Sequence, residues 1–350
     1  CAVLARLLQH DAQILAHPVH REAEVELAVE HGMAPVFHLP GLGRALGDHV
    51  ELRHAATARA VQPELYDAHD RIYASLIFER TRHVAEALKI ARPDAQVGGT
   101  GWDLTTTLEG IGISTTEQDY SIYPRYKASI GFLQRGCRLK CGFCIVPKLE
   151  GAVRHNQTVE EMWRGDPWPK HLVVLDNDFF GNPQWQARID EIKAGGFRVN
   201  FNQGINARFL DEQTAAAIAS VPFYDENMKQ KRLYTAWDNK KDEKRLFRGL
   251  HCLVAAGIKP SAIMVYILVG YWPGETHEDR DERRAKIRAF GADPYPMPYV
   301  RTPEIVAFQR WVIGHYDKIV PWETWWGRGK GRPENCGPIR SSQLSLLGEE

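Results

Sequence analysis

Three crowded cysteines are the residues of this chain whose type and spacing point most directly to chemistry. Cys137, Cys141 and Cys144 follow the pattern C-x3-C-x2-C, and the other three of the six cysteines lie far from them in the sequence. A structural disulfide uses cysteines in pairs, so three adjacent thiols favour metal binding. An iron–sulfur cube held wholly by protein takes four thiolates. Three thiolates would leave one iron of such a cube open, as a catalytic metal requires, so the spacing predicts a metal site that is compatible with an open coordination position.

The residues around these cysteines extend the pattern. Phe143 directly precedes the last cysteine, and the run Ile145-Val146-Pro147 follows it, with Glu150-Gly151 and Arg154 shortly after. This segment resembles the cluster loop of radical S-adenosylmethionine (SAM) enzymes, in particular the methylthiotransferase and cobalamin-domain branches. The resemblance implies a [4Fe-4S] cluster on the three cysteines, SAM chelated to the open iron, and Phe143 near the adenine.

The resemblance also implies an activity. A radical SAM enzyme cleaves SAM reductively and forms a 5′-deoxyadenosyl radical, which abstracts hydrogen from a substrate. An electron donor such as flavodoxin or ferredoxin would be its partner. No residue stands out as a general acid or base, so the catalytic residues and the substrate are not predicted.

Three other interpretations fit parts of the pattern. His155 would complete a zinc site with the cysteines, although a second pair of zinc ligands is missing. A methylthiotransferase acting on RNA or protein would resemble this chain at the cysteines, but it carries a second cluster on three N-terminal cysteines, and only Cys1 precedes Cys137 here. A non-catalytic binding module stabilised by metal is the alternative from another class of protein.

Charge and hydropathy exclude some classes of function. Lys plus Arg and Asp plus Glu number 44 each, so the net charge gives no indication of general nucleic-acid binding. No apolar run is long enough to span a bilayer, and the few cysteines favour a reducing compartment. We therefore expect a cytoplasmic protein that does not insert into membranes.

The chain before the cysteines divides into three segments. Residues 1–35 have no assigned function, although Arg21 to Val29 is expected to form a helix. Residues 36–104 contain a strand–helix–strand pattern that resembles a small, degenerate Rossmann-like domain of the cobalamin-binding kind. Its glycines at 98–101 would let a corrin approach, but no D-x-H-x-x-G segment is present, so cobalamin is not favoured as a cofactor. Residues 105–126 read as a linker.

Strands and helices alternate six times over residues 127–326, and a tail expected to be disordered follows at residues 327–350. The strands are predicted at 127–133, 171–175, 198–202, 232–237, 262–269 and 295–300. Six units are too few for a closed eight-stranded barrel. They match the α/β fold that the resemblance implies, which is a partial, open (β/α)6 barrel.

Polar residues follow the predicted strands, where ligands bind in α/β folds. By resemblance, the residues after the second strand would hold the SAM amino group. The residues after the third strand would contact the carboxylate or ribose of SAM, since a guanidinium pairs well with a carboxylate. The turn from Pro273 to Thr276 resembles one that lies against adenine. In addition to Phe143, the candidate SAM contacts are Asp176, Asn177, Asp178, Asn202, Gln203, Arg208, Asp238, Gly270, Gly274 and Glu275.

Overall fold

The computed structural model describes residues 25–31, 49–55, 71–76, 79–106, 110, 120 and 125–327. These residues fall into two compact units, one that ends at Arg198 and one that begins at Val199. Most of the predicted linker, and the predicted tail after Gly327, lie outside the described residues. Within the described part, no helix is both long enough and apolar enough to cross a bilayer.

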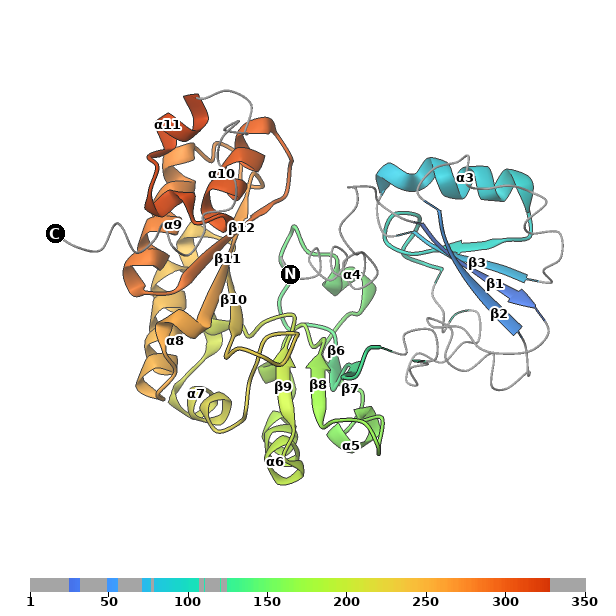
Figure 1. The fold of residues 1–350 in the computed structure, drawn as a ribbon, viewed down its shortest axis with the longest axis horizontal. Coiled ribbons are helices and arrows are strands. Elements are labelled where there is room, and N and C mark those ends of the chain that lie inside the picture. Colours follow the sequence, from blue (N-terminus) through green and yellow to red (C-terminus); the bar gives the residue numbers. More distant parts are fainter. Residues whose placement is uncertain are drawn as a thin grey trace. The chain divides into compact units, whose positions relative to one another are not determined.

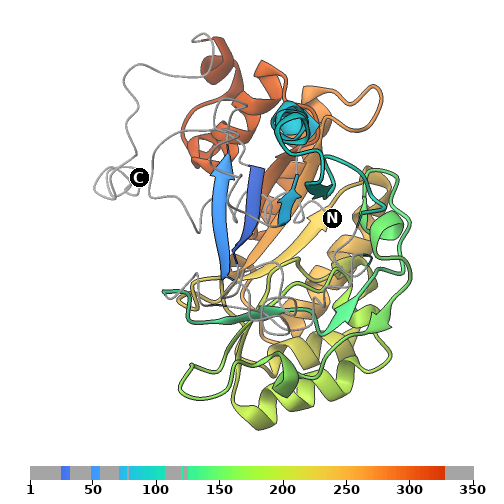
Figure 2. The same cartoon turned by 90° about the vertical axis from the view of Figure 1, so that its right-hand side faces the viewer.

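The first sheet of the first unit is mixed. Its strands have the order β2-β1-β3-β4; β1 is antiparallel to both of its neighbours, and β3 is parallel to β4. Helix α3 joins β3 to β4 and covers one face of the sheet in Figure 1, and Figure 2 shows this helix along its axis. The elements are β1 (Val25–His31), β2 (His49–Ala55), β3 (Arg71–Ser75), α3 (Arg82–Ala91) and β4 (Gln96–Gly98).

The strand–helix–strand unit forms because both partners have an apolar face. Helix α3 buries Val84, Ala85 and Leu88, which are spaced one helical turn apart, against Ile72 and Leu76 from β3 and the residue after it. The predicted βαβ unit is thus confirmed as a local structure. The sheet around it is not purely parallel, because two antiparallel strands extend one side of it.

The predicted helix from Arg21 to Val29 is wrong over its described part, since β1 runs from Val25 to His31. The reason is visible in the sequence. Val25, Leu27 and Val29 alternate with Glu26 and Glu30, which is the period of two that favours a strand. This segment, for which no function was predicted, supplies a strand that pairs with both β2 and β3.

The remainder of the first unit holds the cysteines. Strands β5 and β8 pair in parallel, and the next strand, β9 (Arg198–Phe201), begins at the last residue of this unit. A short antiparallel ladder joins β6 to β7. The elements are β5 (Ser129–Gly131), β6 (Gln134–Arg135), α4 (Val146–Leu149), β7 (Arg154–His155), α5 (Val159–Met162), β8 (His171–Val174) and α6 (Trp185–Gly195).

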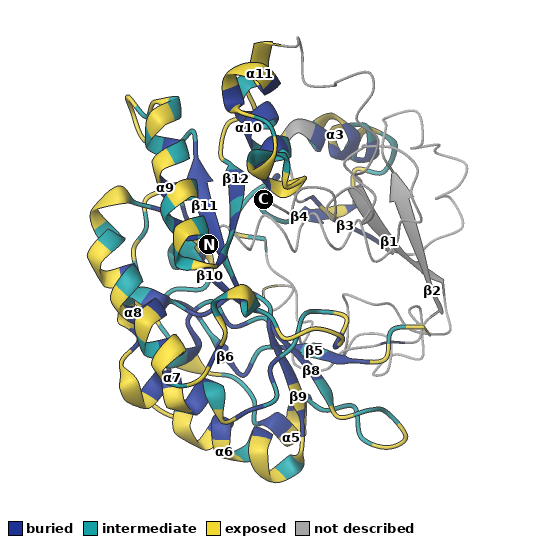
Figure 3. Ribbon diagram, turned by 60° about the vertical axis from the view of Figure 1, so that its left-hand side comes forward, coloured by how far each residue is buried: buried dark blue, intermediate teal, exposed yellow. Residues whose placement is uncertain are grey.

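The second unit continues the alternation of strands and helices. Strands β10, β11 and β12 form a parallel sheet, in which β11 is almost wholly buried, as the dark strand in Figure 3 shows. Its remaining elements are α7 (Glu212–Ala219), β10 (Leu233–Trp237), α8 (Glu243–Ala255), β11 (Ile263–Val269), α9 (His277–Phe290), β12 (Asp293–Pro298), α10 (Pro303–Ile313) and α11 (Trp322–Gly327).

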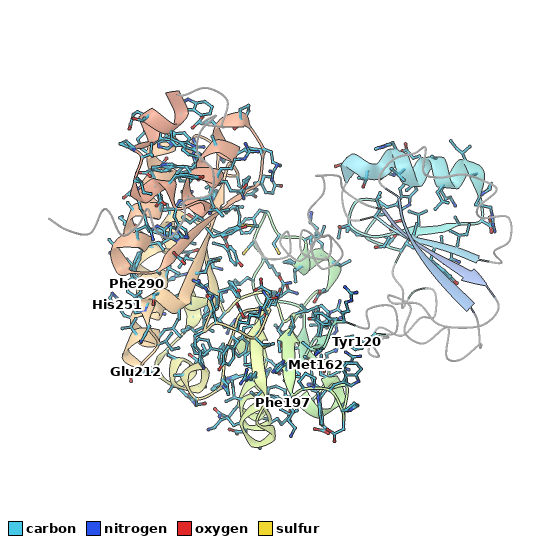
Figure 4. All side chains as sticks on the ribbon, in the orientation of Figure 1. Tyr120, Met162, Phe197, Glu212, His251 and Phe290 are labelled. Atoms are coloured by element: carbon cyan, nitrogen blue, oxygen red, sulfur yellow. The ribbon has the colours of Figure 1, made fainter. Side chains whose placement is uncertain are left out.

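The helices of this unit pack through their apolar faces. Helix α8 buries Leu246, Leu250 and Leu253. Its outer side meets α9, where the rings of His251 and Phe290 lie edge to face with centroids 5.2 Å apart, as labelled in Figure 4. Short 3-10 turns complete the described chain at Glu79–Thr81, Phe179–Gly181, Ala207–Phe209, Lys240–Asp242, Pro260–Ala262 and Tyr316–Lys318.

The local predictions for residues 127–326 are confirmed element by element. Each predicted strand has a counterpart, Thr158 and Glu161 form a capping box at the start of α5, and Pro303 lies in the first turn of α10. The described residues thus form a mixed α/β structure with four small sheets, none of which is closed. The partial (β/α)6 barrel stays a prediction.

Candidate functional site

The three cysteines lie on one loop, residues 136–144, between β6 and α4, and we call it the cysteine loop. It begins at Gly136, whose φ of +82° is a conformation that side chains rarely adopt. A Cβ atom there would lie 2.2 Å from the carbonyl oxygen of Ala152. Only glycine therefore allows the chain to enter the loop so close to residue 152.

None of the three thiols of the loop forms a disulfide among the described residues, and the thiols differ in their surroundings. Cys137 and Cys144 are buried, and each sulfur accepts a peptide N–H, from Leu139 at 3.4 Å and from Val146 at 3.3 Å. Cys141 is only half-buried. Burial raises the pKa of the Cys137 thiol. Two of the three sulfurs are thus held in place by the backbone of their own loop.

The donor set suits an iron–sulfur cluster. Such clusters are bound by cysteine sulfur, and N–H groups directed at the sulfurs tune their reduction potential; both features are present at Cys137 and Cys144. Among the described residues, however, no three or more Cys, His, Asp or Glu side chains are already gathered in a metal-binding arrangement. His155, the candidate fourth zinc ligand, lies exposed on β7. Cluster binding would therefore draw the thiols together.

The carboxylates after β8 are used by the backbone that leads into the loop. Asp176 is 3% exposed, and its Oδ1 accepts the peptide N–H groups of Leu133 and Gln134 at 2.8 and 3.1 Å. Asp178 accepts the N–H of Arg138 at 3.2 Å and pairs with its guanidinium at 2.9 Å. These two predicted SAM contacts thus also connect the end of β8 to the cysteine loop.

Several buried polar atoms beside the loop have no partner. Both amide atoms of Gln134, Oδ2 of Asp176 and Oδ1 of Asp178 make no hydrogen bond with the described residues. A buried polar group without a partner costs about 1–3 kcal/mol. Burial also raises the pKa of Asp176 to about 8, although the two peptide N–H groups oppose this shift. The edge of the sheet therefore offers donors and acceptors that a bound molecule would satisfy.

The other predicted residues of this unit are less enclosed. Phe143 is half-buried within the loop. Asn177 is also half-buried, and its amide nitrogen lies 3.4 Å from Oε2 of Glu150. Neither side chain has the burial of Asp176 or Asp178.

The second unit carries a separate set of polar residues after β9 and β10. Gln203 is 6% exposed, and neither of its amide atoms has a partner among the described residues. Asp238 is 4% exposed, and its Oδ1 is likewise unpartnered. Burial raises the pKa of Asp238, while the guanidinium groups of Arg208 and Arg283 oppose that shift. Both side chains retain unused capacity for hydrogen bonding.

Two further predicted residues follow β9: Arg208, which has protein partners, and Asn202, which is half-buried. Arg208 donates to Asp242 at 2.7 Å and to Asn206 at 3.0 Å, so its guanidinium stabilises the chain after β9. Asn202 is half-buried at the same strand end. These two contacts use two of the five N–H donors of Arg208, and its role toward a SAM carboxylate stays a prediction.

The turn after β11, residues 270–276, is closed by Glu275. Its carboxylate accepts the N–H of Gly270 at 2.5 Å and pairs with Arg283 of α9. Gly270 and Gly274 both have positive φ, at +77° and +76°. Trp272 donates its indole N–H to the carbonyl oxygen of Asp238 at 2.6 Å, which ties the turn to the end of β10. In this structure, Glu275 shapes the turn.

Three residues of these sites were not predicted from the sequence. Glu150 was noted only as part of the motif, yet its carboxylate accepts the N–H of Gly136. Gln134 directly follows the predicted strand at 127–133, begins β6 and has a fully buried amide, and its place at a strand end was a usable signal. Arg283 lies on a helix rich in charged residues, so nothing local distinguishes it from its exposed neighbours.

No protein-family model matches the chain, and no curated protein sequence is similar to it. The functional conclusion therefore depends on the residues and their geometry.

Proposed function

We propose that this chain is a radical SAM enzyme that binds a [4Fe-4S] cluster at Cys137, Cys141 and Cys144. The observation that carries the proposal is the cysteine loop itself, which holds three cysteines outside any disulfide of the described residues, and two of their sulfurs accept peptide N–H groups. A cluster bound there would supply the low-potential electron, taken from a donor such as flavodoxin or ferredoxin, that reductive cleavage of SAM to methionine and a 5′-deoxyadenosyl radical requires.

The protein residues would bind and orient SAM and the substrate. Within the first unit, the unpartnered Oδ1 of Asp178 is an acceptor suited to an amino group, and the unpartnered Oδ2 of Asp176 would be an acceptor when that carboxyl is ionised. Within the second unit, Gln203 offers a donor and an acceptor, and Asp238 offers an acceptor. Burial of these groups supports a ligand-binding role, since leaving them unsatisfied is costly.

Anaerobic reconstitution with iron and sulfide tests the proposal. We expect about four irons per chain and the absorption of a single cube, and incubation with SAM and dithionite should release 5′-deoxyadenosine. About eight irons would instead favour the methylthiotransferase alternative, and zinc in the purified protein without SAM binding would favour the non-catalytic module.

Matched cysteine variants locate the cluster. Cys141→Ala should abolish both the cluster and 5′-deoxyadenosine formation. Cys252→Ala changes a half-buried free cysteine on α8, outside the loop, and should retain both. A wild-type protein without a cluster signal, or full cluster occupancy in Cys141→Ala, would overturn the proposal.

A further inference from the structure

The peptide groups on both sides of Cys137 are held by carboxylates from elsewhere in the first unit. The N–H of Gly136 donates to Oε2 of Glu150 at 2.8 Å, and the N–H of Arg138 donates to Oδ2 of Asp178 at 3.2 Å. The N–H of Cys137 itself donates to the carbonyl oxygen of Gly151 at 3.2 Å. Three consecutive peptide groups around this cysteine therefore have defined partners.

Both carboxylates are buried and paired with arginine. The side chains of Glu150 and Asp178 are 5% and 1% exposed, and they lie 3.2 Å from Nε of Arg135 and 2.9 Å from Nε of Arg138. Hydrogen bonds to an ionised group are about twice as strong as neutral ones, and a buried setting strengthens them further. The chain on each side of Cys137 is thus fixed at a peptide group and at a side chain.

Cys141 has no such support. It is half-buried, and no hydrogen bond to its thiol is found among the described residues, in contrast to Cys137 and Cys144. The loop is therefore rigid at its first cysteine and less constrained at its second. A metal would first meet Cys137, whose backbone is already fixed, and the other thiols would then move toward it.

We propose that Glu150 and Asp178 are positioning residues for the metal ligand Cys137. They fix the backbone on both sides of Cys137 before metal arrives, and they place two negative charges beside the bound cluster. This inference rests on the proposed function. Its consequences are weaker metal binding when the Glu150 anchor is removed, and a more positive reduction potential when only its charge is removed, because nearby charge helps to set that potential.

Cobalt(II) titration of the metal-free protein tests the first consequence without any activity assay. Binding is followed by the thiolate-to-cobalt absorption. Residues that orient metal ligands typically contribute about 10- to 100-fold in metal affinity, so we expect a loss of that size in Glu150→Ala. Glu150→Gln keeps an acceptor for the N–H of Gly136 and should bind cobalt nearly as tightly as the wild type. Glu160→Ala, at an exposed residue of α5, is the matched control and should be unchanged.

A potentiometric titration of the reconstituted cluster tests the second consequence. Glu150→Gln and Asp178→Asn should each shift the midpoint potential to a more positive value, whereas Glu160→Gln should not. A role confined to folding would leave the potential of a correctly folded variant unchanged.

The outcomes separate this inference from the proposed function. A wild type that binds neither cobalt nor a cluster would overturn both. Tight cobalt binding by Glu150→Ala, together with an unchanged potential in Glu150→Gln and Asp178→Asn, would overturn the inference and leave the proposed function standing. If circular dichroism shows that Glu150→Ala does not fold, the potentials of the two amide variants decide.

Discussion

The cysteine loop and the turn at residues 270–276 share the same local design in two different units. Each begins with a glycine of positive φ, Gly136 at +82° and Gly270 at +77°. In each, the glycine N–H donates to a buried glutamate, Glu150 or Glu275, and that glutamate pairs with an arginine. Glycine permits the sharp turn, and the carboxylate fixes it.

The cysteine loop and the turn differ in how deeply the side chain of their arginine is buried. Arg135 lies next to the cysteine loop, and its side chain is 20% exposed. Arg283 is 2% exposed on α9, and it also donates to the carbonyl oxygens of Trp237 and Leu268. The arginine of the turn is therefore tied to two strands of its unit, whereas the arginine beside the cysteine loop stays partly exposed.

Alanine substitution of Glu275 and of Glu150 should give the largest difference in unfolding free energy between the turn and the cysteine loop. Glu275→Ala leaves a buried arginine unpaired, which typically costs about 3–5 kcal/mol of unfolding free energy. Glu150→Ala leaves a less buried arginine and one peptide N–H, and should cost about 1–3 kcal/mol. Urea denaturation followed by tryptophan fluorescence measures both values.

The control for these variants is Glu282→Ala, which removes a surface partner of Lys240 and Lys286 that is 42% exposed. It should cost less than about 1 kcal/mol. A loss in Glu150→Ala equal to that in Glu275→Ala would contradict the difference in anchoring.

Alanine substitutions at the glycines should sharpen the comparison at a smaller scale. Gly136→Ala forces both an unfavourable φ and a Cβ atom 2.2 Å from the Ala152 carbonyl, and we expect a loss of about 3 kcal/mol. Gly274→Ala, at +76° with open space around it, involves the backbone strain alone and should cost about 1 kcal/mol. Thermal or urea unfolding measures the loss of stability in both variants. Equal losses in Gly136→Ala and Gly274→Ala would contradict the expected order.

The pH dependence of stability should report on Asp176 beside the cysteine loop. Because its pKa is raised to about 8 in the folded protein, the folded state keeps a proton that the unfolded chain has released above pH about 4. This contribution to stability is complete below pH 4 and is lost as the pH rises toward 8, with a slope of up to about 1.4 kcal/mol per pH unit.

Asp176→Asn cannot ionise and keeps an oxygen for the N–H groups of Leu133 and Gln134. Its unfolding free energy relative to the wild type should therefore rise with pH, by about 1.4 kcal/mol between pH 6 and pH 7. Urea titrations of both proteins at several pH values measure this difference. A difference that does not change with pH would show that Asp176 is ionised in the folded protein.

Much of the local structure was predictable because its causes act within a few residues. The capping box at Thr158 and Glu161, the proline that opens α10 and the apolar spacing of α8 each identify a helix without any tertiary information. The same kind of signal was misread at residues 25–29, where alternation of apolar and acidic residues indicates β1. There, the period of two is a local signal for a strand, and the predicted helix is wrong.

The sequence by itself determined the three cysteines of one loop and the polar residues that follow the strands, because residue type and spacing are local properties. Only the tertiary structure decided the partners. Asp176 meets Leu133 across 43 residues, and Asp178 meets Arg138 across 40; Glu275 is committed to Arg283 and the turn. The physical reason is that a buried carboxylate must take whichever donors the packed chain brings to it, and no local pattern specifies those donors.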